Sequence, residues 1–298
     1  MSIPAVDFGG FSLSEGEISD RELHKLSREL QTAFTEVGFV FLHNTGITQE
    51  EVRPAHIQIS CASAQHKMPH MCSFSPTTPT TLNPSAPDLK EAFNAASLQP
   101  DIKWPPSDAV PGFQEIQTNF FLRCKELSLR VLRVMAHSLG LDPEVFLSAH
   151  QFIGTDVNGT TLRSLYYPPV NSEKAKEGQL RCGEHSDYGS ITLLFQNSKG
   201  LQVRRRSGEF ITAPSIPGAV LVNIADLMQR WTSDQFVSVL HRVLLPPPGD
   251  SSTRQSLAFF VQPDDEAMIS CCDGSNKYPP ISAGDYLTDR FSESYGQS

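Results

Sequence analysis

One stretch near the middle of the chain decides both the fold and the chemistry, and it reads Cys182-Gly183-Glu184-His185-Ser186-Asp187-Tyr188-Gly189-Ser190-Ile191-Thr192-Leu193-Leu194-Phe195. Alternate side chains of an extended strand point to the same face, so His185 and Asp187 are expected to project together while Ser186 turns away. A neutral imidazole and a carboxylate on one face are two of the three ligands of a 2-His-1-carboxylate metal site. Because His-x-Asp also occurs often by chance, this interpretation needs support from the rest of the chain.

The third ligand is expected to be His241, the only histidine after residue 187. It opens the apolar run 241–245, which is typical of a strand, so its side chain can point into a barrel interior. A lone histidine there is more often a core residue, but the upstream His-x-Asp favours a ligand. A triad of His185, Asp187 and His241 leaves Fe(II) three open positions, two for a bidentate keto acid and one for dioxygen. Zinc with the same ligands and one water is the competing interpretation, because ligand types alone do not exclude it.

A second pair of residues, Arg254 and Ser256, is also spaced two apart at the start of a predicted strand. They are expected to share a face, where the planar guanidinium and the hydroxyl both offer donors to a carboxylate. An arginine that points into a barrel needs a resident anion, because an unpaired buried charge is very costly. The distal carboxylate of 2-oxoglutarate meets that need, whereas an isolated arginine is more often part of a surface ion pair.

The composition of the whole chain is that of an ordinary globular protein. Its 298 residues are 39% hydrophobic and 19% charged, with a net charge of −9. This acidic balance argues against nucleic acid and anionic membrane as partners. The six cysteines include no Cys-x-x-Cys pair, and neither a signal peptide nor an apolar run of about 20 residues is visible. These features predict a cytoplasmic protein with free thiols, and they leave the oligomeric state open.

The spacing of apolar residues divides the chain into a helical first half and a β-rich second half. Residues 3–8 are expected to form an edge strand, followed by a helix capped at Ser19 or Asp20 and then a buried strand at 39–42. A second long helix is expected to begin after Gly112. From about residue 150 the predicted strands are 151–153, 161–167, 190–196, 201–203, 219–223, 241–245 and 257–262. The chain is therefore expected to be one composite unit over 1–298, with a mostly helical part at 1–150 and a β core at 151–298.

Residues 68–88 are rich in Pro, Ser and Thr and predict an irregular loop. His66 and His70 lie four apart beside it, but Pro69 and the composition favour a solvated pair over a metal site. Residues that line a substrate pocket are expected from 68–115, from Tyr166 and from the segment after Phe260. Only one of Phe259 and Phe260 is expected to face that pocket, because their side chains alternate.

The order of these motifs resembles the isopenicillin N synthase-like group of iron- and 2-oxoglutarate-dependent dioxygenases, which includes plant flavonoid and gibberellin oxidases. The resemblance runs nearly from end to end and rests on an ordered set of segments. They are Ile3-Pro4-Ala5-Val6-Asp7, Val37-Gly38-Phe39-Val40, Leu162-Arg163-Ser164-Leu165-Tyr166-Tyr167-Pro168, Gly183-Glu184-His185-Ser186-Asp187-Tyr188-Gly189, Gly200-Leu201-Gln202-Val203, Val222-Asn223-Ile224-Ala225-Asp226, Ser238-Val239-Leu240-His241-Arg242-Val243 and Arg254-Gln255-Ser256.

The resemblance implies a double-stranded β-helix, or jelly roll, mainly β with supporting helices. It implies that His185, Asp187 and His241 bind Fe(II), that Arg254 and Ser256 hold 2-oxoglutarate, and that Tyr167 reaches the co-substrate or the substrate. The implied reaction uses O2, releases succinate and CO2, and oxidises a C–H bond of a small molecule by hydroxylation, desaturation or cyclisation.

The chain departs from the group's pattern at Leu165, where many plant members carry Asn, and in the longer segment 246–252. Two alternatives stay open at this point. One is an iron-dependent oxidase that does not use 2-oxoglutarate, and the other is a non-catalytic metal-binding or interaction protein.

Overall fold

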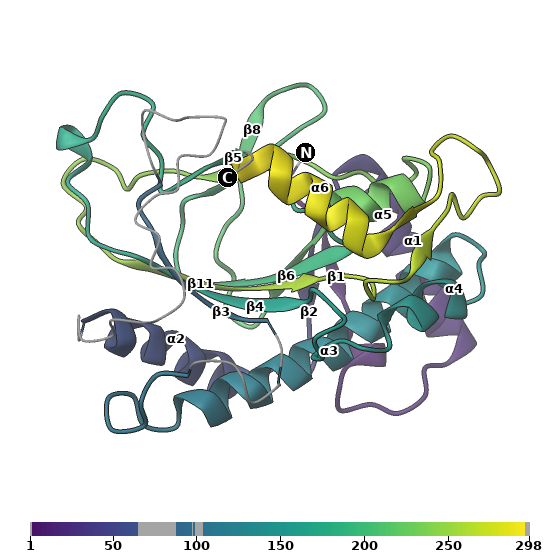
Figure 1. Ribbon diagram of the computed structural model, residues 1–298, viewed down its shortest axis with the longest axis horizontal. Coiled ribbons are helices and arrows are strands. Elements are labelled where there is room, and N and C mark those ends of the chain that lie inside the picture. Colours follow the sequence, from purple (N-terminus) through teal and green to yellow (C-terminus); the bar gives the residue numbers. More distant parts are fainter. Residues whose placement is uncertain (1, 65–87, 97, 99–103, 296–298) are drawn as a thin grey trace.

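Two β-sheets pack face to face, with helices over the outer face of the larger one (Figure 1). A computed structural model of the chain describes residues 2–64, 88–96, 98 and 104–295. All strand pairs within these residues are antiparallel except the first, β1 with β2. This arrangement is the jelly roll that the family resemblance implies.

The larger sheet has seven strands and the smaller one has four. In spatial order the larger sheet is β1 (Ala5–Asp7), β2 (Phe39–His43), β9 (Val220–Ile224), β6 (Ile191–Gln196), β11 (Arg254–Val261), β4 (Thr161–Tyr167) and β3 (Glu91–Ala95). The smaller sheet is β5 (Cys182–His185), β10 (His241–Val243), β7 (Leu201–Arg204) and β8 (Phe210–Thr212). A separate two-stranded ladder joins β12 (Met268–Ile269) to β13 (Ile281–Ser282).

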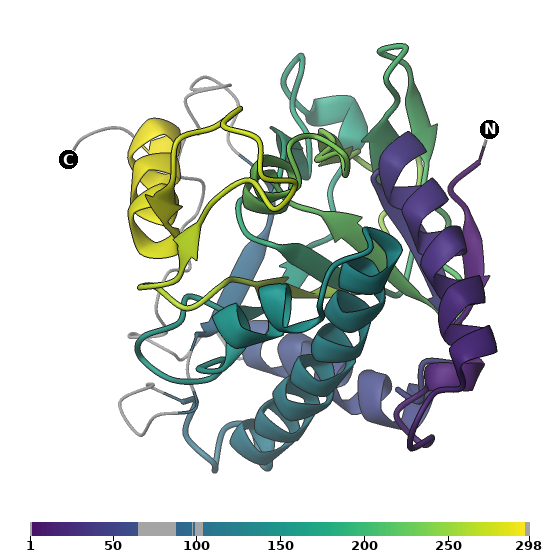
Figure 2. The same cartoon turned by 90° about the vertical axis from the view of Figure 1, so that its right-hand side faces the viewer.

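The helices lie on both sides of the larger sheet. Below it in Figure 1 are α2 (Gln49–Ala64) and α3 (Phe113–Ser138), and α1 (Asp20–Glu36) packs against both α3 and β2. The short helices are α4 (Glu144–Leu147), α5 (Asp226–Trp231) and three 3₁₀ turns at Gly9–Phe11, Ser148–His150 and Ser172–Lys174. The C-terminal helix α6 (Ala283–Tyr295) lies on the opposite side of the sheet from α2 and α3, and Figure 2 shows it on the far side of the molecule from α1.

The central strand β11 shows why the sequence specifies two cores. Arg254, Ser256 and Phe260 line the cavity between the sheets, while Leu257 and Phe259 face the helices and are fully buried. Because side chains alternate along a strand, one strand supplies both the polar lining of the cavity and the apolar contact with α3. Phe260, and not Phe259, is therefore the phenylalanine that faces the cavity.

The first helix and strand begin and end where the sequence indicates. Ser19 is the N-cap of α1, and its Oγ accepts a hydrogen bond from the Glu22 backbone N–H at 3.3 Å. Gly38 then turns the chain into β2 with a φ of +74°. A Cβ at Gly38 would lie 2.3 Å from the Val237 carbonyl oxygen, so only glycine is accommodated there.

Two parts of the fold differ from the sequence prediction. Residues 151–153 form a turn, not a strand, because the backbone N–H groups of Gln151 and Phe152 donate to the Asp264 carboxylate at 2.9 and 3.0 Å. These N–H groups are therefore not available to a sheet. The sequence also did not indicate β3, α2 or α6. The sequence Glu91-Ala92-Phe93-Asn94-Ala95 in β3 contains no β-branched residue, so strand propensity gives no signal for it.

Several predictions fall on residues that the structure does not describe. The 68–88 loop lies outside the described residues except for Asp88, and so does the pair His66 and His70. Four cysteines, Cys124, Cys182, Cys271 and Cys272, are free thiols. Among the described helices, none has the length and apolar composition that crossing a bilayer requires.

The contact between β11 and α3 gives a test of the core. The Phe259 ring is fully buried and meets the Phe121 ring edge-on at 4.9 Å. We expect Phe259→Ala to lower the free energy of unfolding by about 3–5 kcal/mol, because it removes buried apolar area and leaves a cavity. Urea unfolding of the metal-free protein measures this. Phe152→Ala is the control, because Phe152 is 51% exposed and should change stability by less than about 1 kcal/mol. Equal losses in both variants would contradict the assignment of Phe259 to the core.

Candidate active site

Three potential metal ligands meet at the mouth of the cavity between the sheets. His185 ends β5 and His241 begins β10, and the two residues lie directly opposite each other in the ladder. Asp187 follows β5, and its Oδ1 lies 3.9 Å from His185 Nε2 and 3.7 Å from His241 Nε2. The three ligand atoms all lie within 4.8 Å of one another. The structure thus brings together the three residues that the sequence singles out.

Backbone carbonyls orient both imidazoles. His185 Nδ1 lies 2.9 Å from the Gly183 carbonyl oxygen, and His241 Nδ1 lies 3.2 Å from the Val239 carbonyl oxygen. A carbonyl can only accept, so each Nδ1 carries the proton and donates it. Each Nε2 then faces the Asp187 carboxylate and is the nitrogen that can bind a metal, which is the orientation that a metal ligand needs.

The other oxygen of Asp187 is held by the larger sheet. Asp187 Oδ2 accepts hydrogen bonds from Thr192 Oγ1 on β6 and from Asn223 Nδ2 on β9, both at 2.7 Å. These bonds satisfy Oδ2 and leave Oδ1 facing the two histidines. One carboxylate therefore connects the two sheets at the site.

The protonation of the triad favours a bound cation. Burial opposes ionisation of Asp187, yet His241, His185 and the two hydrogen bonds lower its pKa, so the carboxylate is charged. Burial, together with the neighbouring His185, lowers the pKa of His241 to about 4 and keeps it neutral. Burial also opposes charge on His185, but Cys182 and Asp187 raise its pKa to about 9. The His185 side chain is 37% exposed, which moderates that shift. A metal ion that displaces the extra proton of His185 is attracted by the same negative groups, Cys182 and Asp187.

At the other end of the cavity, Arg254 is a buried cation with no acidic partner among the described residues. It is only 1% exposed. Its Nη1 donates to Ser256 Oγ at 3.1 Å and its Nη2 donates to Gln196 Oε1 at 2.8 Å, while Nε is buried without any partner. An uncompensated buried guanidinium is very costly, so this end of the cavity requires an anionic ligand.

Tyr167 completes this end of the cavity. It lies opposite Arg254 in the β4–β11 ladder, and the Arg254 guanidinium carbon is 4.8 Å from the centre of its ring. Burial raises the pKa of Tyr167, so the hydroxyl stays protonated and remains a donor. Leu165, two residues earlier on β4, lines the same cavity with an apolar side chain.

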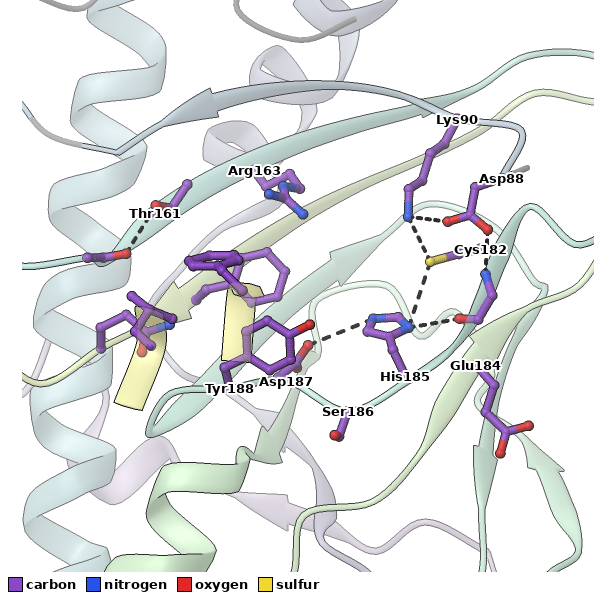
Figure 3. Close-up of a pocket in the computed structure, with 16 residues that line it drawn as sticks. Asp88, Lys90, Thr161, Arg163, Cys182, Glu184, His185, Ser186, Asp187 and Tyr188 are labelled. Atoms are coloured by element: carbon purple, nitrogen blue, oxygen red, sulfur yellow. Dashed lines mark hydrogen bonds and ion pairs between the residues drawn. The ribbon is translucent and has the colours of Figure 1, made fainter. Parts of the chain in front are cut away.

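Two cavities share His185 and Asp187 among their lining residues. An inner cavity of about 60 Å³ runs from His185, Asp187 and His241 to Arg254 and Ser256. A second, outer cavity of about 310 Å³ is also lined by His185 and Asp187, but not by His241 or Arg254 (Figure 3). Volumes of a few hundred Å³ are typical of small-molecule sites. The donor set, two neutral imidazoles and a carboxylate, suits iron, and the unpaired Arg254 suits the distal carboxylate of 2-oxoglutarate.

The outer cavity also contains residues that the sequence did not single out as functional. Lys90 Nζ lies 2.8 Å from Asp88 Oδ2 and 3.0 Å from Cys182 Sγ, and all three residues line the cavity (Figure 3). Burial opposes the thiolate of Cys182, but Lys90 and His185 lower its pKa to about 7. No motif marks these residues, because Asp88 and Lys90 reach the site only through the pairing of β3 with β4.

The expected pocket-lining segments are confirmed in part. Asp88 and Lys90 come from 68–115, and Gln262, Leu287 and Phe291 follow Phe260. Tyr166 was predicted wrongly, because it packs against the apolar core on the helix side of β4. Arg163, three residues earlier on β4, occupies the cavity side, as strand alternation requires.

Comparison with known proteins agrees with this geometry. A profile of the 2OG-Fe(II) oxygenase superfamily matches residues 158–263. The chain is 28% identical over 339 aligned positions to the 2-oxoglutarate-Fe(II) type oxidoreductase ppzD of Metarhizium rileyi, across 99% of this chain and 92% of that protein. A full-length Neurospora crassa protein crystallised with alpha-KG (2-oxoglutarate) superimposes with a TM-score of 0.83 and 32% identity, over 97% of this chain and 96% of that one. The same protein with alpha-KG and thymine gives a TM-score of 0.80. JOX2, crystallised with 2OG, Fe and JA, gives 0.76 at 26% identity, over 99% of this chain and 86% of JOX2.

The chain therefore belongs to the 2OG-Fe(II) oxygenase superfamily. It is an oxidoreductase, a dioxygenase that depends on Fe(II) and 2-oxoglutarate and uses O2 as its oxidant.

A buried histidine supports the chain just after the metal motif. His150 Nδ1 donates to the Phe146 carbonyl oxygen at 2.6 Å, and its Nε2 lies 2.8 Å from Ser190 Oγ, which precedes β6. Its ring stacks on Trp231 at 6.2 Å. Burial lowers the pKa of His150 to about 4, so the ring is neutral in the folded state.

This depressed pKa predicts acid sensitivity. The unfolded imidazole titrates near 6.5, so the contribution of His150 is fully present above that pH and is lost as the pH falls towards 4. We expect the metal-free protein to lose up to about 3 kcal/mol of unfolding free energy over this range through His150 alone. In His150→Gln the slope of stability against pH should be shallower, as urea titrations from pH 7 to 4.5 measure. His24→Gln, on an exposed histidine, should keep the wild-type slope. Identical slopes in wild type and His150→Gln would contradict the assigned pKa.

Proposed function

We propose that His185, Asp187 and His241 hold the catalytic Fe(II) and that Arg254, Ser256 and Tyr167 bind 2-oxoglutarate beside it. The enzyme would then oxidise a C–H bond of a small-molecule substrate in the outer cavity. The observation that carries this proposal is a single cavity with three convergent ligand atoms at one end and an unpaired buried arginine at the other.

The protein's own residues give each binding partner a defined place. The Gly183 and Val239 carbonyls fix the two imidazoles, so the ligand geometry exists before metal binds. The Arg254 guanidinium, with Nε free, can form a charge-assisted hydrogen bond to the distal carboxylate of the keto acid. Ser256 and Tyr167 add neutral hydroxyl donors at the same end.

Apolar side chains of the inner cavity exclude water from the reacting atoms. Leu165, Leu194, Ala258 and Val243 line the space between the triad and Arg254. When bound, iron and 2-oxoglutarate supply the oxidising chemistry, in which O2 is consumed and succinate and CO2 are released. The protein positions the co-substrate on the inner side of the triad and leaves the outer side for the substrate.

The size and chemistry of the outer cavity support a small-molecule substrate. Its volume is about 310 Å³, and two structural relatives contain thymine and JA.

The net charge of −9 argues against nucleic acid and anionic membrane as partners. The free described thiols are compatible with the reducing cytoplasm, where we place the protein. We treat residues 1–298 as one composite unit because a single apolar core includes residues of α1, α3 and β11.

The assignment of Asp187 as a ligand predicts a loss of metal binding. Asp187→Ala removes the only charged ligand and should abolish retention of one Fe(II) per chain after anaerobic loading and desalting. Asp156→Ala, on an exposed carboxylate, should retain iron as the wild type does. Iron content by colorimetric assay and folding by circular dichroism are measured on the same samples. Wild-type iron content in folded Asp187→Ala would overturn the triad.

The assignment of Arg254 predicts a separate loss of co-substrate binding. Anaerobic addition of 2-oxoglutarate to the Fe(II) protein should produce a weak visible charge-transfer band, and its titration gives the Kd. In Arg254→Gln the Kd should rise by about 10–100-fold, because a hydrogen bond to a charged group is lost. Iron retention should stay at the wild-type level. Arg28→Gln, on an exposed arginine of α1, serves as the control, and an unchanged Kd in Arg254→Gln would rule out this role.

A further inference from the structure

A second cavity-lining arginine, Arg163, has donors that no described residue uses. Its Nε donates to Asn94 Oδ1 at 2.8 Å, and its guanidinium carbon lies 5.4 Å from the centre of the Phe260 ring. Within the described residues, neither terminal nitrogen makes a hydrogen bond or an ion pair. Asn94 and Phe260 therefore hold the guanidinium, and the two terminal nitrogens remain free towards the cavity.

The position of Arg163 separates it from the co-substrate end. Arg163 lines both cavities, whereas Arg254 lines only the inner one. Figure 3 shows Arg163 and Lys90 on one side of the outer cavity, with Asp187 and His185 across from them. A ligand group in the outer cavity can therefore reach Arg163 but not Arg254.

Among the charged side chains that line the outer cavity, Arg163 is the one without an oppositely charged partner in the described residues. Lys90 pairs with Asp88 at 2.8 Å, and Glu184 pairs with Arg204 at 3.0 Å. With Fe(II) and 2-oxoglutarate bound as proposed above, the charges of the metal, Asp187, the keto acid and Arg254 cancel. Arg163 then contributes one excess positive charge, and a half-buried cation favours an anionic partner.

The rest of the outer wall is largely apolar. Phe260 and Tyr188 are joined there by Leu287 and Phe291 from α6. The Tyr188 and Phe291 rings meet edge-on at 5.6 Å. Aromatic walls of this kind bind flat apolar groups, so the cavity has a charged end at Arg163 and an apolar body.

We propose that the substrate is a small carboxylic acid with a flat apolar body, whose carboxylate binds end-on to the two terminal nitrogens of Arg163. With Nε held by Asn94, this pair of nitrogens forms the planar fork that matches the two oxygens of a carboxylate. The apolar body then lies against Phe260 and Tyr188, which presents a C–H bond to the triad. Arg163 is thus a specificity-determining residue, and this inference rests on the proposed roles of the triad and Arg254.

The test compares carboxylic acids with their uncharged carboxamides and with one anion of another shape. The probes are 2-naphthoate, indole-3-acetate and trans-cinnamate, each paired with its carboxamide, together with 2-naphthyl phosphate as an anion of different shape. Their Kd values are measured by calorimetry on anaerobic protein loaded with Fe(II) and 2-oxoglutarate. We expect at least one acid to bind the wild type about 10–100-fold more tightly than its amide. We also expect the phosphate to bind more weakly than the acid with the same ring.

Arg163→Gln should remove the preference for acids and leave amide binding and the Kd of 2-oxoglutarate unchanged. Arg163→Lys keeps the charge without the fork and should retain only part of the preference, which provides a second variant should Arg163→Gln not fold. Arg28→Gln is the matched control and should behave as the wild type.

Three results would overturn the inference. One is the absence of any preference for an acid over its amide in the wild type, including no binding across the panel. Another is an equal preference for acids in Arg163→Gln and wild type. The third is a weaker Kd for 2-oxoglutarate in Arg163→Gln, which would assign Arg163 to the co-substrate. Failure of the proposed function is distinguishable, because the 2-oxoglutarate band is then missing from the wild type before any probe is added.

Discussion

The buried carboxylate of Asp187 is the group on which the rest of the site depends. A carboxylate at 6% exposure must have all its acceptor positions used, and the two sheets divide them. Thr192 and Asn223 of the larger sheet donate to Oδ2, while His185 and His241 of the smaller sheet face Oδ1. The relative position of the two sheets therefore sets the metal geometry. The helices α2 and α3 act on the site indirectly, because they support the outer face of the larger sheet.

The positive charge of Arg254, at the end of the inner cavity away from Asp187, explains why the co-substrate is a keto acid. Strand β11 places Arg254 in a closed space where the described residues provide neutral acceptors but no carboxylate. The fold tolerates this because β11 has a second face, whose side chains, including Phe259, are buried against α3. Apolar burial on one face offsets the cost of a charge on the other. The site is thus incomplete without an anion, and in the proposed function 2-oxoglutarate supplies one, with a second end that reaches the metal.

Much of this site could be predicted from the sequence because its parts are local. His185 and Asp187 are two residues apart, as are Arg254 and Ser256, so strand alternation alone places each pair on one face. His241 could be added because no other histidine follows. Lys90 could not be predicted as a site residue, since it reaches the cavity through the pairing of β3 with β4. The pairing in turn could not be seen, because the sequence of β3 has little strand propensity. Arg163 shares a face of β4 with Tyr167, so alternation places it on the cavity side, but no motif marks it as functional.

The two wrong predictions have different causes. Residues 151–153 are apolar enough for a strand, but the distant Asp264 carboxylate takes up their N–H groups. Tyr166 was expected in the pocket, although its two neighbours on β4, Leu165 and Tyr167, line the inner cavity. For residues 151–153 the deciding partner, Asp264, is distant in the chain and beyond the range of local patterns. For Tyr166 strand alternation with Tyr167 already decides the side, because adjacent residues of β4 point to opposite faces. The family resemblance could assign Tyr167 to the site. It could not assign the residues that line the outer cavity, because these vary with the substrate.

The central claim is that one cavity holds iron at the triad and 2-oxoglutarate between the triad and Arg254. The most direct test is a crystal structure of the anaerobic complex with Fe(II) and 2-oxoglutarate, with anomalous data collected at the iron absorption edge. The predicted result is one anomalous peak bonded to His185 Nε2, Asp187 Oδ1 and His241 Nε2, with the distal carboxylate of the keto acid on Arg254. An iron peak elsewhere, or a keto acid that makes no contact with Arg254, would contradict it.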